Sequence, residues 1–184
     1  MNRTRRRIAF TLALALLALR TAPAHAGRAA ELSAASSAAL KKLYAANPKT
    51  KILGEKAVAI LVFPKIVKAG FMVGAQGGDG AMRRGGKTIG YYRSLAGSYG
   101  FQAGVQRFGY ALFFMNQAAI NQLNDTDGWE IGSGPSLVIV DDGFAKSFTS
   151  NTLTSDVYAY IFDQKGLMAG IGIQGSKITH IHPK

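Results

Sequence analysis

The stretch that decides the fold lies at residues 70–76 and reads GFMVGAQ. Residues 100–106, GFQAGVQ, repeat its pattern of Gly-Phe-x-apolar-Gly-apolar-Gln. In a strand, Gly70 and Gly74 lie on one face and the apolar side chains between them on the other. Glycines on one face let a sheet coil sharply or let another backbone come close. The repeat therefore predicts a strongly curved antiparallel sheet, a partial barrel or a sandwich, and leaves the wall of a ligand cavity as a second interpretation.

Strand patterns continue through a β-rich core that we expect over residues 56–182. Residues 57–63, AVAILVF, form an apolar run ended by a proline, which is typical of a strand buried on both faces. Gly85-Gly86 predicts a two-residue hairpin, and the run 77–80, GGDG, predicts another turn. A further turn is expected at 141–143, before a strand at 144–148. The predicted class is α+β and mainly β, with a curved antiparallel sheet flanked by an N-terminal helix and one or two short helices.

The N-terminal helix is expected over residues 29–46. Its apolar residues recur near the 3.6-residue period, and Asn47-Pro48 ends it. The apolar stripe is mostly alanine, which favours packing on its own domain over lying on a membrane. A shorter helix is expected over residues 116–123.

Residues 1–26 have the pattern of a cleavable bacterial export signal. Several arginines precede an apolar run over residues 8–19 that is too short to span a bilayer. Ala24-His25-Ala26 is a small-x-small cleavage site. We therefore expect a single domain over residues 27–184 in an exported protein that is periplasmic, outer-membrane associated or secreted. The arginine-rich start leaves both the general secretory and the twin-arginine route open.

Basic charge is concentrated in one part of the chain. The 184 residues carry 22 Lys and Arg against 10 Asp and Glu, for a net charge of +12. Residues 27–107 hold 13 basic and 3 acidic residues, a net charge of +10, whereas residues 108–184 have a net charge of −3. Such a one-sided field indicates an anionic partner: lipid headgroups, nucleic acid or acidic polysaccharide. Export from the cytoplasm argues against nucleic acid.

The basic residues near the predicted hairpins are the candidate lipid-binding surface. They are Lys65, Lys68, Arg83, Arg84, Lys87 and Arg93. Three tyrosines nearby are candidate interface aromatics, since tyrosine suits a lipid–water boundary: Tyr91, Tyr92 and Tyr99. Each Lys or Arg contributes ~1 kcal/mol at an anionic membrane surface, so docking through them is expected to be reversible and salt-sensitive.

Residues suited to catalysis or metal binding are scarce. The chain has no cysteine, and only His180 and His182 remain after the leader. Gly86-Lys87-Thr88 is the end of a phosphate-loop pattern, but alanine stands at position 81 where that pattern needs glycine. Two histidines alone do not complete a zinc site. The sequence predicts a protein that is not an enzyme and that has no metal site and no cofactor.

Several ordered blocks resemble the SYLF domain family, which occurs in bacterial exported proteins and in eukaryotic membrane-trafficking adaptors. They are residues 56–64 (KAVAILVFP), 68–74 (KAGFMVG), 99–104 (YGFQAG), 133–135 (SGP) and 165–170 (KGLMAG). The resemblance runs from about Leu40 to Ile181. It implies lipid binding, with phosphoinositide ligands and an actin partner in the eukaryotic members. An exported bacterial protein meets no actin in its own cell.

Charge and resemblance together predict a non-enzymatic lipid-binding protein of the bacterial envelope or secreted space, docking on anionic phospholipid through its basic surface. The alternative is a structural or protein-interaction module that binds an acidic polysaccharide or a partner protein. Lipid could also enter an internal acyl cavity behind Phe71, Val73 and Phe101, so surface docking and an internal pocket both stay open.

Overall fold

The computed structural model of the protein describes residues 27–125, 127–140, 153–166, 172–173 and 175–184. Residues 98–103 and 166 are described by their backbone alone. The predicted leader at 1–26 and the predicted turn and strand at 141–148 lie outside the described residues. Within the described ranges, no helix combines the length and the hydropathy that crossing a bilayer requires.

Two long antiparallel strands, β1 (Ala59–Arg84) and β2 (Lys87–Phe114), dominate the fold. Their pairing runs from Arg84 opposite Lys87 to Ala59 opposite Phe114. The predicted turn at Gly85-Gly86 joins them, and both glycines have positive φ, 55° and 78°. This left-handed backbone is the conformation that a two-residue hairpin requires and that glycine adopts without strain.

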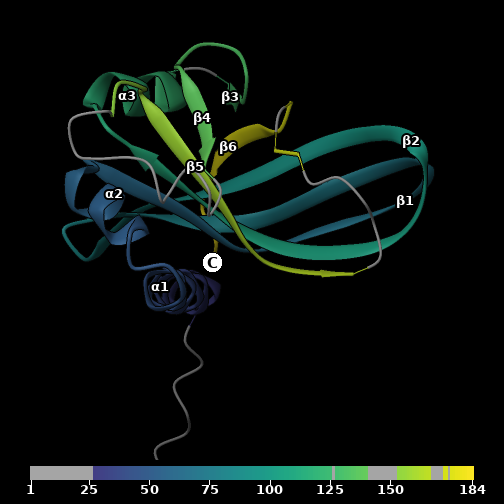
Figure 1. Ribbon diagram of the computed structural model, residues 1–184, viewed down its shortest axis with the longest axis horizontal. Coiled ribbons are helices and arrows are strands. Elements are labelled where there is room, and N and C mark those ends of the chain that lie inside the picture. The colour runs from purple at the N-terminus through teal and green to yellow at the C-terminus, as the bar shows by residue number, and fades with distance from the viewer. Residues whose placement is uncertain (1–26, 126, 141–152, 167–171, 174) are drawn as a thin grey trace, which may run out of the picture.

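The ribbon formed by β1 and β2 bends back on itself near residues 70–74 of β1 (Figure 1). The turn predicted at 77–80 is wrong, because these residues continue β1. Their glycines serve the bend instead: a Cβ on Gly80 would lie 2.6 Å from the carbonyl oxygen of Val62 and 2.7 Å from the ring of Phe63. The two halves of β1 can therefore approach as closely as they do only without a side chain at this position. The predicted strong curvature is confirmed, in the form of a half-barrel.

The remaining strands pair along the other edge of β2. The sheet order is β3-β6-β2-β5-β4, with β1 also paired to β2; the strands are β3 (Trp129–Glu130), β4 (Leu137–Val140), β5 (Val157–Gly166) and β6 (Lys177–Ile181). β4 and β5 are parallel, so the sheet is mixed, whereas β2 pairs with β1, β5 and β6 in the predicted antiparallel way. About sixteen residues separate these two strands, which suffices for a parallel crossover.

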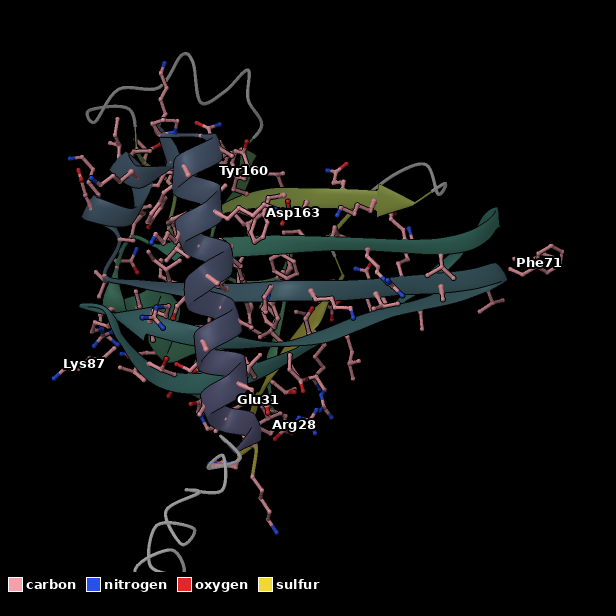
Figure 2. The ribbon with its side chains drawn as sticks, turned by 90° about the horizontal axis from the view of Figure 1, so that it is seen from below. Arg28, Glu31, Phe71, Lys87, Tyr160 and Asp163 are labelled. Atoms are coloured by element: carbon pink, nitrogen blue, oxygen red, sulfur yellow. The ribbon has the colours of Figure 1, made fainter. Side chains whose placement is uncertain are left out.

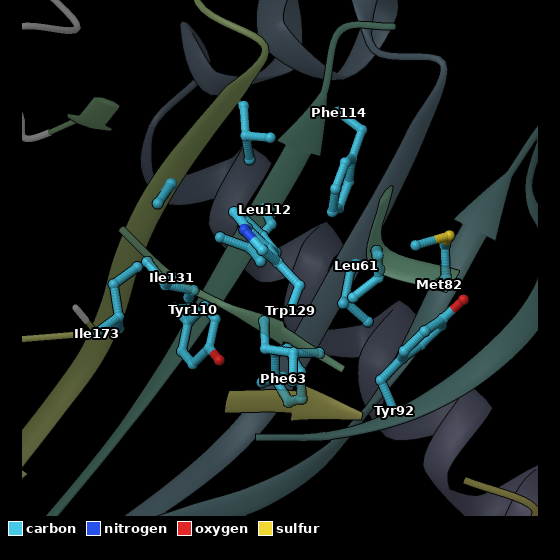
Figure 3. Close-up of a cluster of buried hydrophobic side chains, with 14 of the residues drawn as sticks. Leu61, Phe63, Met82, Tyr92, Tyr110, Leu112, Phe114, Trp129, Ile131 and Ile173 are labelled. Carbon is cyan, nitrogen blue, oxygen red and sulfur yellow. The ribbon is translucent and has the colours of Figure 1, made fainter. Parts of the chain in front are cut away.

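Three helices flank the sheet in the described part of the chain: α1 (Arg28–Ala46), α2 (Thr50–Lys56) and α3 (Gln117–Asp125). An inner core fills the space within the curled sheet and includes Phe63, Met82, Tyr110 and Trp129 (Figure 3). An outer core lies between the sheet and the N-terminal helices, with Leu40 and Leu43 of α1 buried against Val62, Phe113 and Tyr158. The expectation that this helix packs on its own domain is confirmed.

Polar contacts fasten α1 to three strands. Near its start, Arg28 pairs with Asp79 of β1 at 2.7 Å, and the hydroxyl of Ser33 lies 2.6 Å from that of Thr88 in β2. Near its end, Lys42 pairs with Asp163 of β5 at 2.6 Å. The helix crosses the strands, which extend beyond it towards Phe71 (Figure 2). The outer face of the sheet is thus covered near the Gly85-Gly86 hairpin and left uncovered towards the bend.

Candidate functional site

The six predicted lipid-binding cations do not form one patch. Lys87 lies at the hairpin end of the molecule, and Phe71 lies at the opposite end, where the ribbon bends (Figure 2). Arg83 and Arg84 flank the same hairpin as Lys87. Lys65 and Lys68 precede the bend in β1, and Arg93 lies between the two ends in β2. We call the two regions the hairpin end and the distal end.

Arg93 is committed to an internal ion pair. Its Nε and Nη2 donate to the carboxylate of Asp79 at 2.7 and 3.0 Å, and Arg28 donates to the same carboxylate. Hydrogen bonding to Arg93 holds the pKa of Asp79 below its usual value, and the pKa of Arg93 is raised in return. One carboxylate thus serves two guanidinium groups, so Arg93 is held in the fold by its ion pair, and the three-residue cluster keeps a net charge of +1.

At the hairpin end, a groove of about 410 Å³ opens between α1, α2 and the β1–β2 turn, with Lys41, Arg83 and Arg84 among its lining residues. Both arginines already hold the fold together. Arg84 donates to the carbonyl oxygen of Val58 at 3.2 Å and to the side-chain oxygen of Gln117 at 2.7 Å. Arg83 donates to Thr88 and to the backbone of the hairpin turn. Their partners are neutral, so the positive charge of this end remains.

At the distal end, two further cations lie near Lys65 and Lys68, although Lys68 is paired with Gln106 and so faces the other side of the sheet from Arg107. Arg107 of β2 is paired with Val67 on one side and with Lys165 of β5 on the other. Opposed residues of neighbouring strands present their side chains on the same face, so Arg107 and Lys165 lie together on the face that α1 leaves uncovered. Lys65, Arg107 and Lys165 are exposed, and among the described residues no carboxylate pairs with them. We call Lys65, Lys68, Arg107 and Lys165 the distal cations.

Sequence reasoning missed Arg107 and Lys165 because they are distant from the Gly85-Gly86 hairpin in the chain. A signal was present for Arg107, which directly follows the second Gly-Phe repeat at 100–106. Lys165 is brought alongside only by the pairing of β2 with β5. A pairing between strands that are 58 residues apart in the chain leaves no local sequence pattern.

The bend itself carries exposed apolar side chains. Phe71, Met72 and Val73 expose 73%, 50% and 58% of their surface, and Val105 on β2 exposes 54%. We call these four residues the distal tip. Because Phe71 and Val73 face outward, they do not line an enclosed acyl cavity, and the side chain of Phe101 lies outside the described set.

The three predicted interface tyrosines have different surroundings. Tyr92 is buried in the inner core, where its hydroxyl donates to Asn124 at 2.8 Å and the ring of His180 meets it edge-on. Burial raises the pKa of Tyr92. Tyr91 is half-buried opposite Ile181, and the side chain of Tyr99 lies outside the described set. Tyr92 therefore acts as a core residue and has no exposed face for a membrane.

The two histidines lie side by side on β6 and just beyond it, with ring centroids 4.6 Å apart. Burial, and then the neighbouring His182, lower the pKa of His180. Nowhere in the described part of the chain do three metal-binding side chains come together.

A family model supports the resemblance seen in the sequence. The model of the Ysc84 family, described as Las17-binding protein actin regulator, matches residues 95–182. The matched segment includes the motif blocks at 99–104, 133–135 and 165–170, and the predicted resemblance to the SYLF family is thereby confirmed. Proteins of this family are lipid-binding domains associated with actin regulation and are not known as enzymes. No curated protein matches the chain.

Proposed function

We propose that this chain, a member of the Ysc84 (SYLF) family, is a non-enzymatic protein that docks on anionic phospholipid through the distal cations. The observation that carries the proposal is the position of Lys65, Arg107 and Lys165, which are exposed and have no carboxylate partner among the described residues. Folding does not use their charges, whereas it uses that of Arg93. Charges of this kind are available to a negatively charged surface.

The expected strength follows from the number of charges. Each Lys or Arg near an anionic membrane contributes ~1 kcal/mol, so Lys65, Arg107 and Lys165 together supply about 3 kcal/mol. Binding of this size is weak, reversible and sensitive to salt. Cations at the hairpin end lie at the opposite end of the ribbon, well beyond the Debye length of about 10 Å at 0.1 M salt, and so add little to this docking.

We further propose that the membrane is one of the bacterial envelope. Arginines followed by an apolar run and Ala24-His25-Ala26 are the pattern of an export signal. An exported protein meets the phospholipid of the envelope, and phosphatidylglycerol is therefore the anionic lipid chosen for the test below.

Vesicle co-sedimentation of residues 27–184 tests the proposal. We expect binding to vesicles of phosphatidylcholine mixed with phosphatidylglycerol, and much weaker binding to phosphatidylcholine alone. The double variant Lys65→Gln/Arg107→Gln is expected to bind about thirtyfold more weakly at low salt, since it loses two charges of ~1 kcal/mol each.

The matched control is Lys41→Gln/Lys87→Gln, which removes the same charge at the hairpin end from two exposed side chains. We expect it to lose much less affinity than the distal variant. A larger loss in the control would place the docking face at the hairpin end. Failure of the wild-type chain to bind either kind of vesicle would overturn lipid docking and favour a module for acidic polysaccharide or a partner protein.

A further inference from the structure

The distal tip gathers exposed apolar side chains at one end of the ribbon. Single exposed apolar side chains are normal on proteins, but Phe71, Met72 and Val73 are consecutive, and Val105 lies nearby on the neighbouring strand, one position beyond the Gly70–Gly104 pair. Contiguous exposed apolar patches mark binding sites for proteins, ligands or membranes. In Figure 2 the side chain of Phe71 points away from the molecule, beyond the end of the ribbon.

Folding does not explain why these residues are apolar. The most exposed of them, Phe71, contributes least to the core. Met72 has φ of 62°, in the left-handed region that glycine and asparagine adopt more easily than methionine. Asparagine would suit both the exposure and the left-handed backbone of position 72 better than methionine, and glycine would suit the backbone better. Three consecutive exposed apolar side chains, one of them on a left-handed backbone, indicate a binding role.

The distal cations lie behind the tip at a distance that suits a membrane interface. Lys68 precedes Phe71 by three residues, and Arg107 is paired with Val67, four residues before Phe71, and with Lys165 on its other side. At about 3.3 Å per strand residue, these three charges lie about 10–13 Å behind Phe71 along the ribbon, and Lys65 lies about 20 Å behind it. The headgroup layer on each side of a bilayer is about 5–8 Å thick. With Phe71 in the hydrocarbon boundary, the long side chains of Lys68, Arg107 and Lys165 would reach forward to the headgroup layer, whereas Lys65 would lie behind it.

Resting on the proposed function, we propose that the distal tip inserts into the hydrocarbon boundary of an anionic phospholipid bilayer, with the nearer distal cations reaching the headgroups behind it. The positive charge near the tip favours an anionic bilayer over a second copy of the chain as the binding partner. A second copy of the chain would bring an identical positive surface against the first, and like charges repel. A bilayer containing anionic lipid offers the complementary charge together with an apolar interior.

The first experiment compares two variants of unchanged net charge in the vesicle assay. The tip variant is Phe71→Ser/Met72→Asn/Val73→Thr, in which asparagine tolerates the backbone of position 72 and threonine suits a strand. The control is Ile89→Thr/Ile139→Thr, which replaces two exposed apolar side chains elsewhere. We expect the tip variant to lose at least about tenfold in affinity and the control to bind as wild type. We also expect some wild-type binding to persist at about 1 M salt, where charges are screened within about 3 Å.

The second experiment locates the tip directly. Because the chain has no cysteine, Val73→Cys and Ile89→Cys each give a unique site for an environment-sensitive fluorescent label. On adding phosphatidylglycerol vesicles, we expect a blue shift at position 73 and none at position 89. Wild-type binding with an unaffected tip variant and no shift at position 73 would overturn insertion while leaving surface docking intact. A vesicle-free dimer that the tip variant abolishes would identify a second copy as the occupant and would also overturn insertion.

Discussion

Among single residues, the ion pair between Arg93 and Asp79 commits the charge of Arg93 to the fold and leaves other cations for binding. Asp79 accepts from Arg93 and from Arg28, and so joins β2 and α1 to β1. Its pKa is lowered, because the charged carboxylate is the form that both guanidinium groups stabilise. A lowered pKa in the folded state gives stability that is present above the unfolded pKa and is lost as the pH falls through the folded value.

We expect Asp79→Asn to lower the free energy of unfolding by about 1–2 kcal/mol near pH 7, because charged hydrogen bonds to two arginines are lost. The difference from wild type should shrink as the pH falls below the unfolded pKa of about 3.9. Urea denaturation at both pH values measures it. Asp163→Asn is the control, since its pair with Lys42 is largely exposed and its replacement should change stability by less than about 0.5 kcal/mol. A difference for Asp79→Asn that stays constant down to low pH would contradict the assignment.

The same pair shows why part of the site could not be predicted. Gly85-Gly86 predicts the hairpin, and an unbulged two-residue hairpin would set Asp79 opposite Tyr92. A register shift between Met82 and Arg83 sets it opposite Arg93 instead. Since one residue of slip moves every side chain beyond it to the other face, this shift buries Tyr92 and pairs Arg93. No feature of the sequence announces it.

At the scale of elements, the glycines of β1 hold the two halves of the ribbon together. A Cβ at position 80 would collide with the backbone oxygen of Val62, which has no freedom to move aside as a flexible side chain would. We therefore expect Gly80→Ala to lower the free energy of unfolding by about 1–3 kcal/mol. Urea denaturation followed by circular dichroism measures the change.

The matched control is Gly97→Ala on β2, where a Cβ would meet no described atom within 4 Å. This substitution should be neutral or slightly stabilising, because alanine restricts the unfolded chain. Equal loss at both positions would mean that strand flexibility, and not close approach at Gly80, is what the glycine provides.

The sequence pattern predicts where helices, strands and hairpins occur better than it predicts how far each strand continues. The helix predicted at 29–46, the hairpin at Gly85-Gly86 and the strong curvature all follow from local composition. The run 77–80 did not read as strand, because glycine-rich polar segments are usually turns. The need for glycine in this run is visible only in the folded chain, where the first half of β1 lies against Gly78 and Gly80. The parallel pairing of β4 with β5 is likewise a property of the assembled sheet.

At the scale of the whole molecule, both ends of the described chain meet on one side. The backbone N–H of Arg28 donates to the carbonyl oxygen of Lys184 at 3.0 Å. The distal tip lies elsewhere, at the end of the ribbon (Figure 2). Neighbouring termini of this kind permit circular permutation.

We expect a permutant that joins Lys184 to Gly27 through a short flexible linker, and opens between Gly85 and Gly86, to fold. A Cβ on either glycine would meet no described atom within 4 Å, so new ends fit there. Its stability should fall by a few kcal/mol at most, because pairing of β1 with β2 then closes a long loop. Near-ultraviolet circular dichroism of buried Trp129, together with vesicle binding, checks that the native structure is retained. A permutant without that signal would show that the turn is needed for folding.

The ladder between β1 and β2, which register shifts interrupt at three points, also predicts the order in which the ribbon folds. Pairs range from Arg84 with Lys87, three residues apart, to Ala59 with Phe114, fifty-five apart. Each pair formed brings the next pair within reach, so a ribbon that zips outward from its turn closes only a short loop at each step. The long-range contacts of the finished sheet, which usually slow folding, are thus reached through a series of local ones. The bend then folds the completed ribbon over its own inner core.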